Sequence, residues 1–303
     1  MVDDSTIRRE GPFGRVLTAM VTPFHEDGSL DLAGAATLAA RLVDAGCDGL
    51  VVSGTTGESP TTSDAEKEHL IRAVAEAVGD RAHVVAGVGT YDTHHTIDLA
   101  RQAEKAGASG LLIVTPYYSR PTQEGLVQHF TAAADATGLP VMLYDIPPRS
   151  IVPIQADTML RLAEHDRIVA VKDAKGDPFA TSEVIARTDL AFYCGDDALN
   201  LPMLSVGSVG VVSVVAHVAA SQYAEMIRAV DAGDLATALR LHRQLIPAVR
   251  AIMMSGEPGA TMAKAAVQVA GVIASRTMRL PLVTATDEQV DALRAALAEA
   301  GVA

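Results

Sequence analysis

The sequence is poor in cysteine and in aromatic residues. It has two cysteines, no tryptophan, and only 4% aromatic residues among 303, so its core has to be built from alanine, valine, leucine and isoleucine. Cys47 and Cys194 each fall at or inside a stretch predicted to be a buried strand, where a reduced cysteine acts as a small apolar side chain. Neither has metal-ligand spacing around it. We therefore expect free thiols, no metal, and a cytoplasmic location.

Long apolar runs and basic clusters are also missing. No uninterrupted apolar run reaches the ~20 residues of a membrane-spanning helix, and the N-terminus lacks the basic-then-apolar order of a signal peptide. The 24 basic residues are outnumbered by 37 acidic ones, which gives a formal charge of −13. Repulsion from phosphates then makes nucleic acid an unexpected partner. We expect a protein that binds neither membranes nor nucleic acid.

What the sequence does contain is a regular alternation. Hydrophobic residues make up 49% of the chain, and apolar runs typical of buried strands recur at short intervals. Alanine-rich stretches with helical periodicity separate them. The best of these covers 63–78, where Ser63 and Glu66 form a capping-box pattern and Gly79 follows the end. The predicted strands cover 16–21, 49–52, 84–88, 111–114, 141–144, 168–171, 190–193 and 209–215.

Eight strands alternating with helices predict an α/β protein with a (β/α)8 TIM barrel. A Gly-x-x-Gly-apolar pattern recurs at Gly46, Gly107 and Gly207, as if each helix ended on the first glycine. A doubly wound open sheet is the competing fold, but no Gly-x-Gly-x-x-Gly turn follows the first strand. We assign the barrel to 1–232, with 1–12 loose, and a small C-terminal helical domain to 233–303. One predicted barrel helix covers 31–45. The predicted helices of the C-terminal domain cover 234–254, 261–272 and 287–300.

Lys172 follows the apolar residues 168–171 within the segment 167–173. This position places an amine at the C-terminal end of a buried strand. A free lysine has a pKa near ~10.4, and desolvation that lowers it to ~7–8 makes the amine a nucleophile toward a carbonyl. A lysine that only solvates the strand end is the alternative. The active sites of such barrels lie at this end of the strands.

Other strand ends carry matching chemistry. The turn 54–58 offers two hydroxyls and free backbone N–H groups between glycines, which can hold a carboxylate. Tyr144 could pass protons, and Arg149 has the fork that binds a carboxylate. Taken singly, these residues could instead be a capped βα turn, an interface aromatic and a solvated loop arginine.

Five segments together resemble the dihydrodipicolinate synthase family of pyruvate-dependent class I aldolases. They are Gly-Thr-Thr-Gly-Glu-Ser-Pro at 54–60, Thr-Pro-Tyr-Tyr-Ser-Arg-Pro at 115–121, Tyr-Asp-Ile-Pro-Pro-Arg-Ser at 144–150, Val-Lys-Asp-Ala at 171–174 and Gly-Asp-Asp-Ala at 195–198. The match extends from about residue 13 to residue 280. Each motif is moderately specific, and their common order makes the resemblance strong.

The resemblance implies a function and a set of roles. Lys172 would form a Schiff base with pyruvate, whose enamine adds to L-aspartate 4-semialdehyde to give 4-hydroxy-tetrahydrodipicolinate in lysine and diaminopimelate biosynthesis. Proton transfer would use Tyr144, Thr55 and Tyr118, the last reaching across from a neighbouring subunit of a homotetramer built as a dimer of dimers. Substrate binding would involve Thr56, Arg149, Val212 and Gly195. No cofactor and no metal are implied.

Two other functions stay open. One is a catabolic aldolase or dehydratase of the same mechanism that acts on a sugar acid, such as N-acetylneuraminate. The other is a ligand-sensing barrel without turnover. Thr55, Thr56 and Arg149 favour the synthase over the first, and the intact set around Lys172 speaks against the second. Asp145 stands where many members have asparagine, which we interpret as a tolerated change.

Three further features receive modest interpretations. Where lysine-inhibited relatives carry His, Asn and Glu, this chain has Pro60, Asp64, Lys67, Tyr91 and His95, so we expect weak or absent feedback inhibition by lysine. His94 and His95 open a predicted helix and point apart, which argues against a metal site. Asp196 and Asp197 are expected to cap the following helix.

Overall fold

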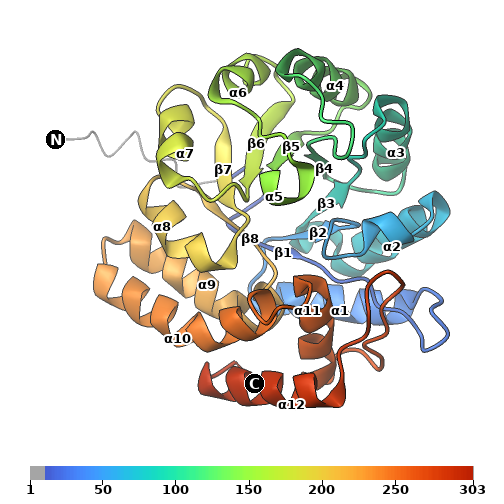
Figure 1. Ribbon diagram of the computed structural model, residues 1–303, viewed down its shortest axis with the longest axis vertical. Helices are drawn as coiled ribbons and strands as arrows, with labels where there is room; N and C mark the ends of the chain where they lie inside the picture. The colour runs from blue at the N-terminus through green and yellow to red at the C-terminus, as the bar shows by residue number, and fades with distance from the viewer. Residues whose placement is uncertain (1–10, 303) are drawn as a thin grey trace.

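The computed structural model describes residues 11–302, and its centre is a closed barrel of eight parallel strands in the order β1 to β8 (Figure 1). The predicted (β/α)8 fold is confirmed. The strands are β1 (Val16–Ala19), β2 (Gly49–Val52), β3 (His83–Gly87), β4 (Gly110–Val114), β5 (Val141–Asp145), β6 (Ile168–Asp173), β7 (Ala191–Cys194) and β8 (Gly210–Ser213).

Helices surround the barrel and cover the outer face of the strands (Figure 1). The barrel helices are α1 (Leu32–Asp44), α2 (Asp64–Val78), α3 (Thr93–Lys105), α4 (Gln123–Asp135), α5 (Pro147–Ser150), α6 (Ala156–Leu162), α7 (Pro178–Ile185), α8 (Asn200–Ser205) and α9 (Ala216–Asp231). Single turns of 3-10 helix occur at η2 (Ser59–Thr61), η3 (Gly79–Arg81) and η4 (Asp197–Leu199). Most strand residues are buried on both faces, as in other parallel sheets covered by helices.

Local sequence signals set the helix ends. The Ser63 hydroxyl accepts from the backbone N–H of Glu66, and the Glu66 carboxylate accepts from the backbone N–H of Ser63. The capping box of α2 is confirmed. Gly46, Gly107 and Gly207 follow α1, α3 and α8 with φ of 103°, 97° and 108°. Such left-handed values favour glycine and end a helix. The repeated glycine pattern therefore marks real helix ends.

Three C-terminal helices follow: α10 (Leu235–Met253), α11 (Gly259–Val269) and α12 (Asp287–Glu299). They gather along one side of the barrel, where α10 and α11 contact α9 (Figure 1). The connection between α9 and α10 is short and the two helices pack together. The domain boundary at 232–233 stays a prediction. The expectation that 1–12 is loose lies almost wholly outside the described residues.

Some element bounds differ from the predictions for identifiable reasons. β1 and β8 are shorter than 16–21 and 209–215, because the backbone N–H groups of Val21 and Val214 bond side chains instead of a neighbouring strand. α11 covers an earlier stretch than the predicted 261–272. It starts directly after Pro258 and ends before Gly271, which has a φ of 70°.

Among the described residues, no helix combines the length and the apolarity needed to cross a membrane.

His217 ties the ends of β1 and β8 together. Its Nε2 accepts from the backbone N–H of Val21 at 3.0 Å, and its Nδ1 donates to the carbonyl of Val214 at 2.7 Å. This arrangement requires the neutral tautomer with the proton on Nδ1. Burial lowers the pKa of His217 to about 4. The charged form is therefore disfavoured in the folded protein.

We predict that His217 makes stability fall as the pH falls. Because its pKa is lower when folded, the unfolded chain binds an extra proton below about pH 6.5, and about 2 kcal/mol of unfolding free energy is lost between pH 7 and pH 5. The unfolding free energy of His217→Gln, measured by urea unfolding at pH 7 and pH 5, should therefore fall by about 2 kcal/mol less than that of the wild type. The matched control His94→Gln, at an exposed position, should keep the wild-type loss. An unchanged pH dependence in His217→Gln would contradict the assignment.

Candidate active site

Backbone strain gathers at the C-terminal end of the barrel. The non-glycine residues with positive φ in the described chain are Ser53, Glu58, Tyr118, Arg120 and Ile151. All lie in the loops after β2, β4 and β5. Such conformations cost about 1–3 kcal/mol each and persist where the surroundings fix them, often at functional sites. This end of the barrel therefore has the backbone conformations that are typical of functional sites.

Lys172 and Tyr144 lie side by side in this region. They are direct partners in the β5–β6 register. The Lys172 Nζ lies 4.2 Å from the centroid of the Tyr144 ring, and both side chains are buried, at 4% and 5% exposure. The amine predicted at a strand end is therefore a shielded group beside a phenol, and the reading in which Lys172 only solvates the strand end is wrong.

Gly195 makes room for this lysine. A Cβ atom at residue 195 would lie 3.0 Å from both Cε and Cγ of Lys172, and 3.2 Å from the Cβ of Ala174. These distances are tighter than ordinary contacts between carbon atoms. The absence of a side chain at Gly195 therefore leaves room for the Lys172 side chain, which passes close to the backbone of residue 195.

A cavity of about 80 Å³ opens beside Tyr144. Thr55 and Tyr144 line it, together with Tyr117 and residues of the turn after β2. Its lining thus combines hydroxyl and phenol groups with the apolar Leu112 and Val114. The structure brings Thr55 and Tyr144 to one cavity. Lys172 is not among its lining residues, but its amine lies against the Tyr144 ring.

The remaining predicted residues lie at different depths. Thr56 is 8% exposed and follows Thr55 in the turn, and Val212 is fully buried in β8, where it pairs with Leu17. Arg149 is exposed on the short helix α5, which lies in front of the barrel in Figure 1. Neither Arg149 nor Val212 lines the cavity described above.

Tyr118 does not enter the cavity of its own chain. Its side chain is 90% exposed and its backbone φ is 72°. Tyr117, which precedes it, lines the cavity instead and packs edge-on against Tyr91, with ring centroids 5.4 Å apart. The two tyrosines thus face different surroundings.

Asp196 and Asp197 behave differently from each other. Asp196 accepts from the backbone N–H of Ala198 at 3.0 Å, which is the capping role expected for it. Asp197 does not cap the helix. It is 3% exposed and accepts from the Ser213 hydroxyl and from the N–H groups of Val214 and Val215, so it fixes the end of β8. The expectation of a shared capping role was wrong for Asp197, because its side chain turns inward.

His94 and His95 lie at the start of α3 as expected. His94 Nδ1 pairs with Asp98 at 3.2 Å, and His95 Nε2 with Asp64 at 2.9 Å. Within residues 11–302 no group of three or more His, Cys, Asp or Glu side chains could hold a metal ion. Cys47 and Cys194 are buried free thiols.

Sequence reasoning missed Ser53 and Tyr117. Ser53 precedes the turn 54–58, has a φ of 58°, lines the cavity and is 2% exposed. Its hydroxyl has no hydrogen-bond partner among the described residues. Its place immediately before the hydroxyl-rich turn was the available signal. Tyr117 stood inside a motif already singled out, but only the second tyrosine of that motif was chosen.

A larger open cavity, of about 640 Å³, lies at the opposite end of the barrel. It is lined by residues that precede β2, β3 and β4, such as Asp48, Arg81 and Ser109. The N-terminal end of such barrels serves stability, whereas catalytic groups come from the C-terminal ends of the strands. Volume alone therefore does not identify the active site here.

A closed eight-stranded parallel barrel with a buried lysine beside a phenol defines a (β/α)8-barrel enzyme. Comparison with known proteins narrows this class. The model of the dihydrodipicolinate synthetase family matches residues 12–300. A 4-hydroxy-tetrahydrodipicolinate synthase of Kineococcus radiotolerans is 63% identical over 292 residues, which cover 96% of this chain and 94% of the relative.

Solved structures agree. A dihydrodipicolinate synthase of Bacillus anthracis superimposes with a TM-score of 0.91 at 44% identity, covering 95% of this chain and 98% of the other. A dihydrodipicolinate synthase of Cyanidioschyzon merolae, solved with lysine bound, gives 0.93 at 39% identity over 97% and 100% of the two chains. The protein belongs to the dihydrodipicolinate synthetase family. The expected resemblance is confirmed.

The residues that led us to expect weak lysine inhibition have well-defined contacts. His95 and Asp64 form the ion pair described above, and the buried Lys67 donates to the carbonyl of Thr62. Tyr91 is 63% exposed. The prediction of weak or absent inhibition concerns a ligand and stays a prediction.

Asp145, directly after Tyr144, lies in an unusual environment. It is fully buried, and its Oδ1 accepts from the N–H of Ile154 at 3.2 Å. Its Oδ2 lies 3.6 Å from the Lys175 amine, beyond hydrogen-bond distance. Burial raises the pKa of Asp145 to about 6, and Lys175 offsets only part of this effect. A charged carboxylate at this position is therefore unfavourable.

We predict that Asp145→Asn stabilises the protein at neutral pH. A carboxyl with a raised pKa contributes stability in the protonated form, which is lost as the pH rises through about 6. The advantage of the variant in unfolding free energy should grow by about 2 kcal/mol between pH 4.5 and pH 7.5. Urea unfolding at both pH values tests this, with the exposed Asp80→Asn as control. A constant difference across the range would refute it.

Proposed function

We propose that this protein is a 4-hydroxy-tetrahydrodipicolinate synthase, a lyase that condenses pyruvate with L-aspartate 4-semialdehyde in lysine and diaminopimelate biosynthesis. The observation that carries the proposal is the shielded Lys172 amine beside the Tyr144 phenol. The high identity to the Kineococcus radiotolerans synthase supports the choice of reaction. No observation favours the sugar-acid aldolase or the non-catalytic barrel.

Lys172 acts as the nucleophile. Its neutral amine attacks the ketone carbon of pyruvate, and loss of water leaves a Schiff base that withdraws electrons from the methyl carbon. Loss of a methyl proton gives an enamine, which forms a carbon–carbon bond to the aldehyde carbon of aspartate semialdehyde. The amine of that substrate then displaces Lys172 and closes the ring, which frees the enzyme.

Tyr144 moves the protons that these steps require. Each stage of imine formation and exchange transfers a proton, and a phenol next to the reacting nitrogen can donate and accept it. Thr55 lines the same cavity and extends the relay. Tyr118 completes it from a second copy of the chain. Its 90% exposure and its absence from the cavity of its own chain support this role.

The turn after β2 and Arg149 bind the substrates. Thr56 and its own backbone N–H hold the pyruvate carboxylate, with Val212 and Gly195 beside the same ligand. The overall charge of −13 opposes anionic substrates, so local donors must compensate. Arg149 on the exposed α5 meets the carboxylate of the incoming aldehyde.

The proposed chemistry uses no metal and no organic cofactor, since the lysine imine itself is the electron sink. The proposed assembly is a homotetramer built as a dimer of dimers, in which Tyr118 crosses an interface. We propose the cytoplasm as the site of action.

The proposal predicts covalent capture of pyruvate on Lys172. Borohydride reduces an imine to a stable amine, so treatment with pyruvate and borohydride should leave a 1-carboxyethyl group on the amine of Lys172 in the peptide that contains it. Mass spectrometry of the digested protein locates it. Lys172→Arg should show no adduct and lose at least about 10³-fold in kcat, because a guanidinium is not a nucleophile at neutral pH. An adduct elsewhere, or full turnover by the variant, would end the proposal.

Arg149→Ala tests the second substrate separately. Loss of a charge-assisted carboxylate contact costs about 1.5–3 kcal/mol, so kcat/KM for aspartate semialdehyde should fall about 10–100-fold. The KM for pyruvate and the rate of borohydride trapping should stay near wild type. The exposed Arg101→Ala is the matched control. Equal turnover of a sugar-acid aldehyde and aspartate semialdehyde by the wild type would favour the other aldolase reading.

A further inference from the structure

The turn 54–58 is joined to the C-terminal domain by a buried ion pair. Lys264, in the middle of α11, and Glu58, the last residue of the turn, are 0% and 1% exposed. The Lys264 amine donates to Glu58 Oε1. It also donates to the carbonyl of Thr277 at 2.9 Å and lies 4.3 Å from the centroid of the Phe24 ring. The ammonium group is thus enclosed by partners.

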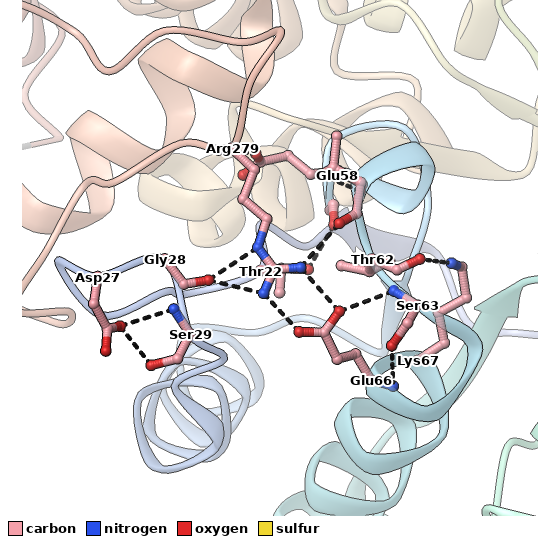
Figure 2. Close-up of polar contacts among 12 residues, drawn as sticks. Thr22, Asp27, Gly28, Ser29, Glu58, Thr62, Ser63, Glu66, Lys67 and Arg279 are labelled. Atoms are coloured by element: carbon pink, nitrogen blue, oxygen red, sulfur yellow. Dashed lines mark hydrogen bonds and ion pairs between the residues drawn. The ribbon is translucent and has the colours of Figure 1, made fainter.

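Arg279 extends the contact. Its backbone N–H donates to Glu58 Oε2 at 3.0 Å. Its guanidinium forms a two-pronged pair with Glu66 at 2.6 and 2.9 Å and also donates to the carbonyls of Gly28 and Thr61. Figure 2 shows this guanidinium between Glu66 and Gly28, close to Glu58. The hydrogen bond to Arg279 holds the pKa of Glu66 at about 2. The segment after α11 is therefore tied to the turn and to the start of α2.

The turn itself needs such support. Glu58 has a φ of 56°, a costly conformation for a residue with a side chain. Within the turn, the N–H of Gly57 and of Ser59 both bond the carbonyl of Gly54, at 3.1 and 3.2 Å. From outside, the Thr22 hydroxyl donates to the carbonyl of Gly57 at 2.7 Å. The Glu58 side chain links the turn to the C-terminal part of the chain.

Stability alone does not explain a buried pair of this kind. Removing two charges from water costs about as much as their attraction returns, and apolar replacements of similar volume are often neutral or stabilising. Directional bonds, by contrast, fix the place of the groups that carry them. The pair joins a turn that lines the same cavity as Tyr144 to a helix outside the barrel.

We propose that Glu58 and Lys264 are positioning residues, through which the C-terminal helical domain holds the turn 54–58 in the geometry that binds pyruvate. The inference rests on the proposed function, because it assumes that Thr56 and its backbone N–H hold the pyruvate carboxylate. Neither Glu58 nor Lys264 touches the substrate. Their effect passes through the backbone that follows Thr55.

Glu58→Gln is the mildest test, since it keeps the side-chain volume and an acceptor for the N–H of Arg279. We expect the KM for pyruvate to rise about tenfold, as small displacements of binding groups do, with the KM for aspartate semialdehyde unchanged. General destabilisation would not separate the two substrates. A folded Glu58→Gln enzyme with the wild-type KM for pyruvate would overturn the inference.

Lys264→Met and the double variant Glu58→Gln/Lys264→Met separate positioning from stability. Lys264→Met leaves a buried carboxylate unpaired, and its Tm should fall by about 10 °C. The double variant removes both charges, so most of the Tm should return while the KM for pyruvate stays raised. Recovery of both Tm and KM in the double variant would show a purely structural pair. If Lys264→Met does not fold, the KM for pyruvate of Glu58→Gln alone tests the positioning role.

Arg276→Met is the matched control. Arg276 belongs to the same C-terminal segment and pairs with Asp287 and Gln268, without contact to the turn. It should lower Tm and leave both KM values near wild type. Borohydride trapping of pyruvate by the wild-type enzyme is measured in parallel. Failure of that trapping refutes the proposed function, whereas trapping with unaltered KM in Glu58→Gln refutes only the positioning role.

Discussion

The pairing of β5 with β6 is the constraint on which the site depends. Tyr144 and Lys172 are 28 positions apart in the sequence, yet the parallel register makes them direct neighbours. Barrel closure then brings the ends of β2 and β7 to the same mouth. Because side chains alternate between the faces of a strand, a shift of one residue would exchange Lys172 with a neighbour and remove the amine from the mouth. Burial of both strands opposes such a shift.

Much of the fold could be predicted because its signals are local. Apolar runs marked the strands, and the Ser63–Glu66 capping box marked a helix start that the structure contains. The ends of β1 and β8 were overestimated. Apolarity continues through Val21 and Val214, and nothing local shows that His217 and Asp197 take their backbone N–H groups. Bonds between distant residues set these ends.

The sequence predicted which residues form the candidate site better than it predicted how their side chains are arranged. Motif order indicated Lys172 and Tyr144, and the parallel register gives their contact. The inward turn of Asp197, the unpartnered hydroxyl of Ser53 and the role of Tyr117 depend on backbone conformations that no local pattern encodes. Lys264 had a signal of its own, since a single charge among Ala263, Ala265 and Ala266 demands a partner. Its partner lies too far away in the sequence to be found without the fold.

That separation has a consequence for how the protein is made. Glu58 and Lys264 lie 206 positions apart, and chains emerge from the ribosome starting with their N-terminal part. The stretch that contains Thr55 and Thr56 is thus synthesised long before the lysine that pairs with its neighbour. A nascent chain that has already completed all eight strands still lacks this partner. Full order in that loop is reached only when translation is nearly complete.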